Sequence, residues 1–348
     1  MAGTYRVAVI GGDGIGPEVT EAALAVLDAA EARFGFTTER TPFEWSAQRY
    51  VTGERVTPAM IEPIRAFDSV LLGAIGHPDA PRGEAEADII FGLRRGLDLF
   101  VNLRPIVLYD ERLCPLKGRT LADVDFVVVR ENTEDVYGRP VRREAAGTPD
   151  ERVSSEMSFT RRGTERIVRY AFELARSRPR KRLTLVDKAN ALQLQEIYRT
   201  VFEEVARDFP DVERDAMYVD AASMWMVLHP ERFDVIVTTN LFGDILSDLG
   251  AALCGGLGSG ASGNIHPGRG SVFEPIHGSA PKYAGQGVAS PIGSIGALAL
   301  MLEHLGEREA AKAVDAAIRK GFATGRIPGI EAGSAPTQAV ARVVAEAL

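Results

Sequence analysis

The sequence predicts an α/β protein with a largely parallel sheet flanked by helices, and two patterns support this prediction. The first is a set of apolar runs of strand length, typical of buried strands, at residues 7–10, 70–72, 126–129, 183–186 and 235–237. The second is apolar residues at helical spacing between these runs, in residues 19–30 and 167–174. Because strands and helices alternate, a parallel sheet with helices on its faces is expected. The Gly-rich residues 255–270 are expected to be a loop.

The length and charge of the chain limit its organisation and its partners. A chain of 348 residues is too long for one small core, which favours two lobes. Its net charge of −8 argues against a nucleic-acid partner. The one basic stretch, Arg176 to Arg182, lies where a helical pattern gives way to a strand, so it is predicted to be a solvated helix end.

Cysteine usage and hydropathy indicate the compartment. Only Cys114 and Cys254 are present, which indicates a reducing environment without a disulfide framework, and five scattered histidines do not suggest zinc. The N-terminus leads into a strand with no apolar signal segment, and no apolar run is long enough to span a membrane. We expect a cytoplasmic protein with no membrane partner.

Residues 11–18 form a glycine-rich turn between the first strand and the first helix. The third glycine of a dinucleotide-binding G-x-G-x-x-G motif would fall on Pro17, which has no N–H to offer a pyrophosphate, and Glu18 would repel an anion. A tight turn is therefore favoured, and an ordinary Rossmann fold is disfavoured.

Three arginines form a candidate site for a small dicarboxylate. Arg94 and Arg104 flank the segment that enters Pro105, and Arg130 ends the strand at 126–129. Guanidinium groups bind carboxylates through paired hydrogen bonds, so several together would orient a diacid. Taken alone, each arginine is more often a surface charge than a ligand contact, but the position of Arg130 at a strand end favours a ligand.

Asp244 and Asp248 are candidate metal ligands. Their spacing of four places both on one face of a predicted helix, and Asp220 could supply a third carboxylate. Oxygen ligands suit Mg²⁺ or Mn²⁺. The alternative is an acidic helix start that complements the helix dipole, but two like charges one turn apart favour a cation between them.

Together these segments resemble the decarboxylating β-hydroxyacid dehydrogenases, the family of enzymes that act on isopropylmalate, isocitrate, homoisocitrate and tartrate. The resemblance covers essentially the whole chain. Its most specific parts are residues 103–105 (Leu-Arg-Pro), 186–190 (Val-Asp-Lys-Ala-Asn), 240–248 and 274–281 (Glu-Pro-Ile-His-Gly-Ser-Ala-Pro).

The resemblance implies roles for the catalytic residues. The three arginines would hold the malate carboxylates, Lys188 would be the general base with Asp220, and Tyr137 would donate a proton to the enolate left by decarboxylation. A divalent cation held by Asp220, Asp244 and Asp248 would stabilise the developing negative charge.

The resemblance also implies a two-lobed fold and a shared active site. Residues 1–101 and 255–348 would form the cofactor-binding lobe, and residues 102–254 the substrate-binding and dimerisation lobe. In this family the counterparts of Lys188 and Asp220 enter the active site from the partner subunit, which implies a homodimer.

The segment before Arg94 indicates the substrate. Ile90 and Phe91 offer no donor to a third carboxylate and would favour an apolar substituent, as in 3-isopropylmalate, whose oxidative decarboxylation to 4-methyl-2-oxopentanoate belongs to leucine biosynthesis. Ala87 replaces a glutamate frequent in isopropylmalate enzymes, Phe91 is bulkier than their usual leucine, and residues 131–134 resemble the isocitrate and tartrate enzymes. Tartrate, D-malate, isocitrate, homoisocitrate or another substituted malate therefore remain alternatives, as does a regulatory paralogue without turnover, although such paralogues typically lose catalytic residues that are retained here.

The resemblance places the NAD(P) site in and after the motif at residues 274–281. The residues expected to bind the cofactor are Glu274, His277, Gly278, Ser279, Ala280, Pro281, Lys282, Tyr283 and Ser290. NAD-dependent members usually have an aspartate where Lys282 stands. A lysine can pair with a 2′-phosphate but cannot accept hydrogen bonds from ribose hydroxyls, so a preference for NADP is expected. Arg326 is a candidate second contact to that phosphate.

Overall fold

The computed structural model describes residues 3–348, which contain a ten-stranded sheet and a separate two-stranded hairpin. In spatial order the strands of the large sheet are β2 (Thr37–Pro42), β1 (Thr4–Gly12), β3 (Ser69–Ala74), β12 (Ser271–Pro275), β11 (Ala261–Ile265), β4 (Val101–Val107), β5 (Asp125–Glu131), β10 (Val235–Thr238), β8 (Arg182–Asp187) and β9 (Glu213–Tyr218).

The sheet is mostly parallel, as predicted. The two outer parts, β2-β1-β3-β12 and β5-β10-β8-β9, are parallel throughout, and the antiparallel pairs β12-β11, β11-β4 and β4-β5 lie between them. All five apolar runs identified in the sequence lie in strands of this sheet.

The prediction of a loop over residues 255–270 is wrong in part. Residues 261–265 form β11, which is fully buried and pairs with β4 and β12. Gly263 is in this strand because space is scarce there: a Cβ atom would lie 3.1 Å from the ring of Phe273. Gly263 therefore permits close packing within β11, whereas in the sequence alone the glycines of this stretch are signs of a turn.

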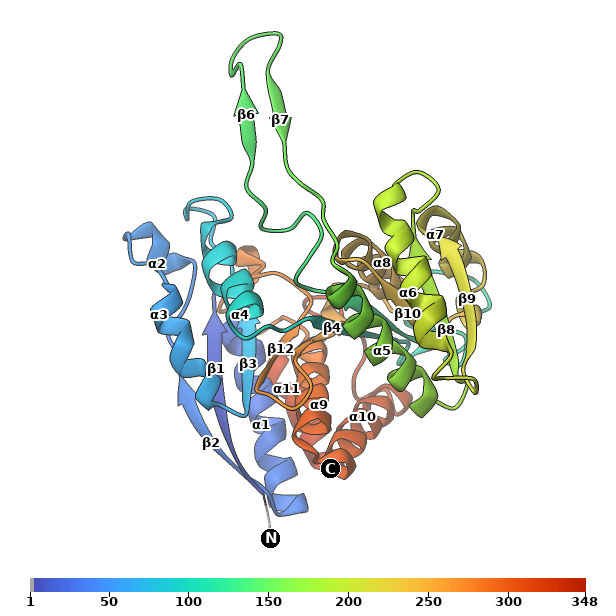
Figure 1. Cartoon of the computed structure of the whole chain (residues 1–348). Helices are drawn as coiled ribbons and strands as arrows, with labels where there is room; N and C mark the ends of the chain where they lie inside the picture. The colour runs from blue at the N-terminus through green and yellow to red at the C-terminus, as the bar shows by residue number, and fades with distance from the viewer. Residues whose placement is uncertain (1–2) are drawn as a thin grey trace.

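Eleven α-helices are present in residues 3–348, and the long ones lie on the faces of the sheet (Figure 1). They are α1 (Gly16–Phe34), α2 (Gln48–Val51), α3 (Pro58–Ile61), α4 (Phe91–Gly96), α5 (Arg161–Ser177), α6 (Glu196–Ala206), α7 (Val219–Leu228), α8 (Asn240–Leu253), α9 (Ile292–Leu305), α10 (Arg308–Ala323) and α11 (Thr337–Ala347).

The helices follow the apolar spacing of the sequence. Pro17 lies in the first turn of α1, whose predicted apolar positions are all buried. The basic stretch Arg176 to Arg182 spans the end of α5 and the start of β8, as predicted, and Arg176 and Arg178 form ion pairs there with Asp211 and Asp234.

Segments from both ends of the chain lie together on one side of the molecule, and the middle of the chain forms the other side (Figure 1). One hydrophobic cluster draws its buried residues from positions 8–99 and Val272, and another from positions 106–254. The strands β4, β11 and β12 lie where the two sides meet (Figure 1).

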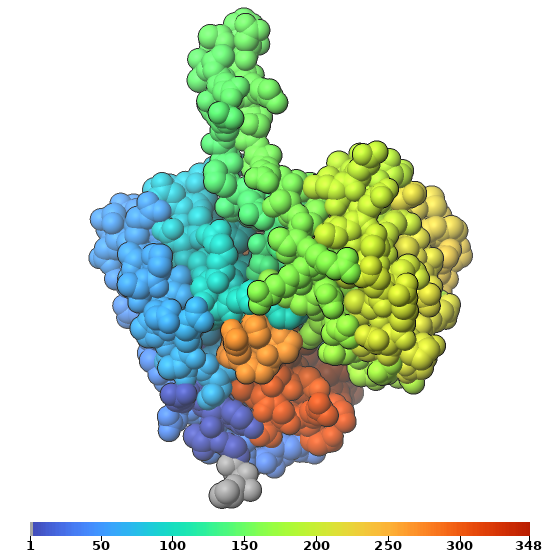
Figure 2. Space-filling model, in the orientation of Figure 1, coloured from blue at the N-terminus to red at the C-terminus, as the bar shows by residue number. Residues whose placement is uncertain are grey.

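A hairpin stands clear of this body. Its strands β6 (Arg142–Glu144) and β7 (Arg152–Ser154) pair only with each other, and the arm projects beyond the surface in Figures 1 and 2. Val141 and Val153 are among the most exposed large apolar side chains of the chain.

Over residues 3–348, none of the helices combines the length and apolarity that a membrane crossing requires.

Candidate active site

Three buried arginines meet near the middle of the sheet. Arg94 lies on α4, Arg104 on β4 and Arg130 on β5, and all three side chains are buried. Arg130 is opposite Asn102 in the antiparallel β4–β5 ladder, so Arg104, two residues along, is its diagonal neighbour on the same face. The structure therefore brings together the three arginines that the sequence singled out.

The arginines destabilise one another as cations. Burial and the neighbouring Arg104 and Arg94 lower the pKa of Arg130 to about 9. Burial likewise lowers the pKa of Arg94. Such a cluster is stabilised by added negative charge, because an anion offsets both the desolvation and the mutual repulsion.

Two of the guanidinium groups have hydrogen-bonding capacity to spare. The Nε atoms of Arg94 and Arg104 are buried and have no hydrogen-bond partner among residues 3–348. Buried donors in proteins are normally paired, and guanidinium donors match the two oxygens of a carboxylate. The cluster is therefore suited to bind a carboxylate ligand.

Asp244 on α8 is the main protein anion facing this cluster. It forms a short ion pair with Arg130, lies 3.4 Å from Arg104 and accepts a 2.8 Å hydrogen bond from the Tyr137 hydroxyl. Burial alone would raise the pKa of Asp244, but Arg130 and Arg104 outweigh burial and hold the pKa below its usual value. Asp244 is therefore a carboxylate at neutral pH.

Asp248 lies one turn further along α8. It is 3.6 Å from Arg104, and burial, together with the charge of Asp244, raises its pKa. Asp244 begins the second turn of α8, so a capping role at the helix start does not explain the pair. Two carboxylates one turn apart, both partly accessible, provide oxygen ligands of the kind that Mg²⁺ and Mn²⁺ prefer.

Tyr137 carries its proton under ordinary conditions. Burial and the hydrogen bond to Asp244 raise its pKa to about 12. Its ring packs near Phe91, with centroids 6.1 Å apart, and the Arg130 guanidinium lies 5.3 Å from the ring centroid. Phe91 begins α4, directly after the short π-helical segment that ends at Ile90. These contacts place Phe91 beside a residue expected to be catalytic.

The start of α8 is fixed by side chains to which the sequence analysis gave no role. Asn240 accepts hydrogen bonds from Arg130 at 2.9 and 2.7 Å, and Asp135 accepts one from the backbone N–H of Leu241 at 2.9 Å. Gly243 lies against Arg130, where a Cβ atom would come within 2.5 Å of the Arg130 side chain. In the sequence, a polar residue at a helix start (Asn240) and a glycine within a helix (Gly243) are the signals that could have indicated these roles. Neither signal identifies Arg130 as the partner.

Lys188 and Asp220 form a separate pair. Lys188 follows β8, Asp220 is near the start of α7, and the Lys188 Nζ atom lies 2.8 Å from an Asp220 oxygen. Within residues 3–348 no group of three or more His, Cys, Asp or Glu side chains is arranged to hold a metal ion. The three-carboxylate metal site is thus not formed within a single chain, and it stays a prediction that requires Asp220 from another copy.

The segment expected to bind the cofactor follows β12 as an irregular loop. Ser279 and His277 are largely enclosed, whereas Pro281 and Lys282 are exposed. The His277 Nε2 atom is buried and unpaired within the described chain, and burial lowers the pKa of the ring. A neutral imidazole with a free nitrogen is suited to a hydrogen bond with a ligand.

The glycine-rich turn after β1 packs directly on this loop. Ile15 donates a 2.8 Å backbone hydrogen bond to the Ser279 carbonyl, and a Cβ atom on Gly14, whose φ is +61°, would lie 1.9 Å from the same oxygen. The turn therefore needs glycine for close approach to another loop, in agreement with the tight-turn interpretation.

The remaining cofactor candidates lie at the edge of this loop. The Lys282 ammonium lies 4.6 Å from the centroid of the Tyr283 ring. Ser290 accepts a hydrogen bond from the backbone N–H of Ile292, near the start of α9. Arg326, the other candidate for this site, forms an ion pair with Glu346.

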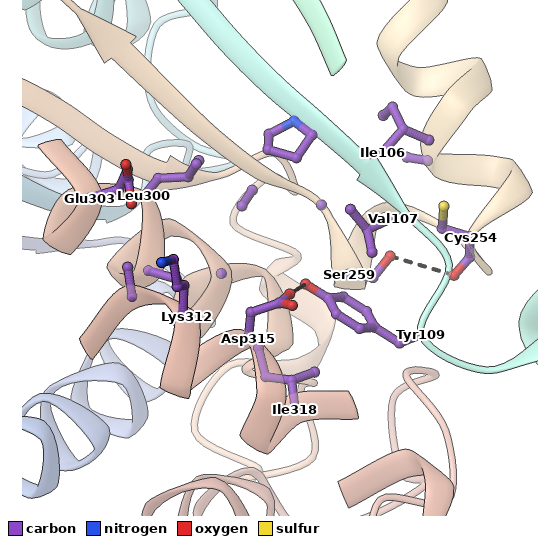
Figure 3. Close-up of a pocket in the computed structure, with 17 residues that line it drawn as sticks. Ile106, Val107, Tyr109, Cys254, Ser259, Leu300, Glu303, Lys312, Asp315 and Ile318 are labelled. Carbon is purple, nitrogen blue, oxygen red and sulfur yellow. Dashed lines mark hydrogen bonds between the residues drawn. The ribbon is translucent and has the colours of Figure 1, made fainter. Parts of the chain in front are cut away.

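A cavity of about 320 Å³ lies elsewhere, among β4, the end of α8, α9 and α10 (Figure 3). Its lining is mostly apolar, and the Tyr109 hydroxyl donates to Asp315 at 3.3 Å across it. None of the three arginines, Tyr137 or Asp244 lines it. The cavity is therefore separate from the candidate active site.

Residues 6–341 match the sequence profile described as isocitrate/isopropylmalate dehydrogenase. The chain is 48% identical over 324 residues to a 3-isopropylmalate dehydrogenase of Thermobifida fusca (strain YX), which covers 91% of each protein. It is 49% identical over 323 residues to a 3-isopropylmalate dehydrogenase of Mycobacterium avium (strain 104), covering 92% of this chain and 94% of that protein.

Solved structures show the same architecture. The isocitrate dehydrogenase from Methylococcus capsulatus is similar with a TM-score of 0.87 at 36% identity, over 99% of both chains. A beta-decarboxylating dehydrogenase from Thermococcus kodakarensis is similar with a TM-score of 0.79 at 35% identity, over 99% of this chain and 96% of that one.

Proposed function

Because the chain belongs to the isocitrate/isopropylmalate dehydrogenase family, we propose that it catalyses the metal-dependent oxidative decarboxylation of 3-isopropylmalate to 4-methyl-2-oxopentanoate. The arrangement of Arg94, Arg104 and Arg130 around Asp244 and Tyr137 is the observation that carries the proposal. It supplies charge for two carboxylates beside a proton donor. The relatives named 3-isopropylmalate dehydrogenase support this choice of substrate.

The substituent of the substrate would contact Ile90 and Phe91. Ile90 packs against an apolar cluster, and Phe91 lies beside Tyr137 and 5.5 Å from the Arg94 guanidinium. Neither side chain can donate a hydrogen bond to a third carboxylate, whereas an apolar group gains free energy from burial against them.

Each polar group then has a defined role. The arginines hold the two carboxylates, and the Lys188–Asp220 pair takes up the hydroxyl proton. Tyr137, protonated because its pKa is about 12, donates a proton to the enolate carbon after loss of CO₂. When bound, a nicotinamide cofactor would supply the hydride acceptor, and Mg²⁺ or Mn²⁺ would supply a Lewis acid for the substrate oxygen. Asp244 and Asp248 would hold this cation together with Asp220.

We propose further that the active unit is a homodimer with shared sites. The α7–α8 surface exposes four large apolar side chains, namely Met224, Val227, Leu228 and Ile245. Exposed apolar groups clustered on two packed helices are typical of an interface. Asp220 lies on α7 and Asp244 on α8, so pairing of this surface with a second copy would bring Lys188 and Asp220 of one chain toward Asp244 of the other. The β6–β7 hairpin, which is too small to be stable alone, supports the same assembly.

The two lobes would divide the binding tasks. Residues 1–101 and 255–348 would bind the nicotinamide cofactor against the Gly14–Ser279 contact, and residues 102–254 would bind substrate and form the dimer. Two of the apolar clusters, one from residues 8–99 with Val272 and one from residues 106–254, follow this division, whereas a larger cluster extends across both lobes.

NADP is the proposed cofactor, because Lys282 is exposed at the edge of the cofactor loop and can pair with a 2′-phosphate.

We expect Lys282→Asp to lower the ratio of kcat/KM for NADP to that for NAD by about tenfold or more, the scale of one lost charge-assisted bond. Lys320→Asp, at an exposed site on α10, is the matched control. An unchanged ratio in Lys282→Asp would remove the case for NADP.

The function is tested by a substrate panel. Reduced cofactor is followed by absorbance with 3-isopropylmalate, isocitrate, homoisocitrate, tartrate and D-malate, with Mn²⁺ and either NAD or NADP. The highest kcat/KM is expected for 3-isopropylmalate. Faster turnover of a polar malate would assign the alternative substrate, and no turnover of any compound would indicate a regulatory paralogue.

A further inference from the structure

A buried network of amide side chains lies behind the arginine cluster. Asn264 on β11 is its centre: its Oδ1 atom accepts hydrogen bonds from Asn102 and Asn132, both at 3.0 Å, and its Nδ2 atom donates to Glu274 at 2.8 Å. Asn102 also donates to Ser262 at 2.8 Å. Every member of the network is buried.

Stability alone does not account for this network. Polar groups in a buried sheet contribute net stability only when all their hydrogen bonds are made. Here the Oδ1 atoms of Asn102 and Asn132 are buried without partners among residues 3–348. Apolar side chains would fill the same positions at lower cost in desolvation. The amides are therefore better explained by what they orient.

The network ends on a substrate-binding arginine. The Glu274 oxygen that accepts from Asn264 is also the one nearest Arg94, 3.5 Å from its terminal nitrogen. Both side chains are buried, so a change in the direction of the Glu274 carboxylate moves the preferred position of the guanidinium. The Asn264 amide is held at its oxygen by Asn102 and Asn132 and donates from its nitrogen to Glu274, so it fixes the direction of the Glu274 carboxylate.

The other end of the network lies next to Arg130. Asn132 follows Arg130 by two residues, just beyond the end of β5, and its side chain also donates to the Leu99 carbonyl at 2.9 Å. The chain from Asn132 through Asn264 and Glu274 to Arg94 thus connects β5 with α4. It fixes the separation of two arginines that would bind two carboxylates.

We propose that Asn264 is a positioning residue for Arg94, acting through Glu274, and that it sets the spacing of the two carboxylate contacts. This inference rests on the proposed function, because Arg94 must bind a substrate carboxylate. Asn264 does not itself contact substrate, and its effect is transmitted through the Glu274 carboxylate.

Asn264→Ala tests the proposal with Ser262→Ala as its control. Ser262 lies on the same strand, is equally buried and also bonds to Asn102, but its removal leaves the contact between Asn264 and Glu274 intact. We expect Asn264→Ala to raise the KM for the dicarboxylate about tenfold, with a smaller loss in kcat. Ser262→Ala should keep both constants within about twofold of wild type. Equal effects of the two variants would overturn the proposal.

A double-mutant cycle separates positioning from general loosening of the sheet. If Asn264 acts through Glu274, the variant carrying Asn264→Ala and Glu274→Gln should have the same KM as Glu274→Gln alone. Independent, multiplying effects would contradict the proposal. Thermal unfolding is measured for each variant, and Asn264→Ser, which keeps a hydroxyl in the network but is too short to reach Glu274, takes the place of Asn264→Ala if that protein does not fold.

Arg94→Lys distinguishes failure of this inference from failure of the proposed function. A large rise in the dicarboxylate KM is expected, because a lysine cannot make the paired contacts of a guanidinium. If Arg94→Lys leaves KM unchanged, the proposed substrate site is wrong. If only Arg94→Lys raises KM and Asn264→Ala behaves like Ser262→Ala, the positioning role alone is wrong.

Discussion

Arg130 shows how single residues of this site depend on one another. Its side chain is almost wholly buried, and this burial, together with two neighbouring arginines, lowers its pKa. Asn240 accepts two of its hydrogen bonds and Asp244 supplies the opposing charge. Any change to Asp244 therefore alters both the proposed metal site and the state of the arginine cluster.

Tyr137 offers a test at the scale of one oxygen atom. Tyr137→Phe removes the hydroxyl that donates to Asp244 and keeps the ring that packs on Phe91. We expect kcat to fall at least about 100-fold, the usual range for loss of a general acid. Because this proton is used after hydride transfer, a burst of reduced cofactor in the first turnover should survive the substitution.

Stopped-flow absorbance for the burst and steady-state rates for kcat check this prediction. Tyr170→Phe, a half-buried tyrosine on α5 outside the site, is the control. Loss of the burst together with kcat would show that Tyr137 acts before decarboxylation, contrary to the proposed order.

At the scale of elements, α8 carries the site because its start is fixed from outside the helix. Asp135 is buried, has a φ of +79° and binds the first turn of α8 through the Leu241 N–H. It also accepts from the N–H of Val136, the residue directly before the proton donor Tyr137. One carboxylate thus joins the loop that carries Tyr137 to the helix that carries Asp244.

We expect Asp135→Ala to reduce both stability and activity. It leaves two partly buried N–H groups unpaired and puts an alanine at a positive φ, which together cost about 2–4 kcal/mol of unfolding free energy. Asp135→Asn keeps an acceptor oxygen and tolerates this φ, so it should retain most of both. Denaturant unfolding and kcat are measured for the two variants, and equal losses in both would contradict the role given to the hydrogen bonds.

The sequence was sufficient for the elements whose apolar pattern is simple. The strands at 7–10 and 126–129 and the helix after Pro17 lie where the pattern predicts. β11 was missed because residues 255–270 contain several glycines, and a single sequence cannot distinguish a glycine that permits a turn from one that permits close packing.

The candidate site, like the fold, could be predicted from the sequence only in part. The sequence singled out Arg94, Arg104, Arg130, Tyr137 and Asp244 by residue type and motif, and the structure brings these five side chains together, while their roles stay a prediction. The supporting residues, such as Asn240, Asn264 and Asp135, were not singled out, because a hydrogen bond between positions more than 100 residues apart leaves no local pattern.

The whole molecule raises the question of how a complete site forms. One chain places Tyr137 and Asp244 among the arginines, and Lys188 with Asp220 in a separate ion pair. The exposed apolar side chains of α7 and α8 lie on the helices that carry Asp220 and Asp244. A two-fold dimer across this surface would form two sites, each with residues from both chains.

Mixing two inactive variants tests this arrangement. Lys188→Met removes the base, and Asp244→Asn removes a metal ligand and the anion beside Arg130, and each homodimer should be inactive. If sites are shared, every mixed dimer contains one site with both defects and one site with none. Random reassociation makes half of the dimers mixed, so activity should recover to about a quarter of the wild-type value.

The recovered activity should appear only after dissociation and reassociation of the mixture, with dimer content followed by light scattering. Each variant taken through the same treatment alone is the control. Sites built wholly within one chain would have one defect in every site of a mixed dimer, so no activity would return. Lys188 and Asp220 contact each other within one chain, so the two residues enter a site together. A mixture that stays inactive would mean that this pair and the arginine cluster of each site belong to the same chain. The proposed dimer mechanism would then be wrong.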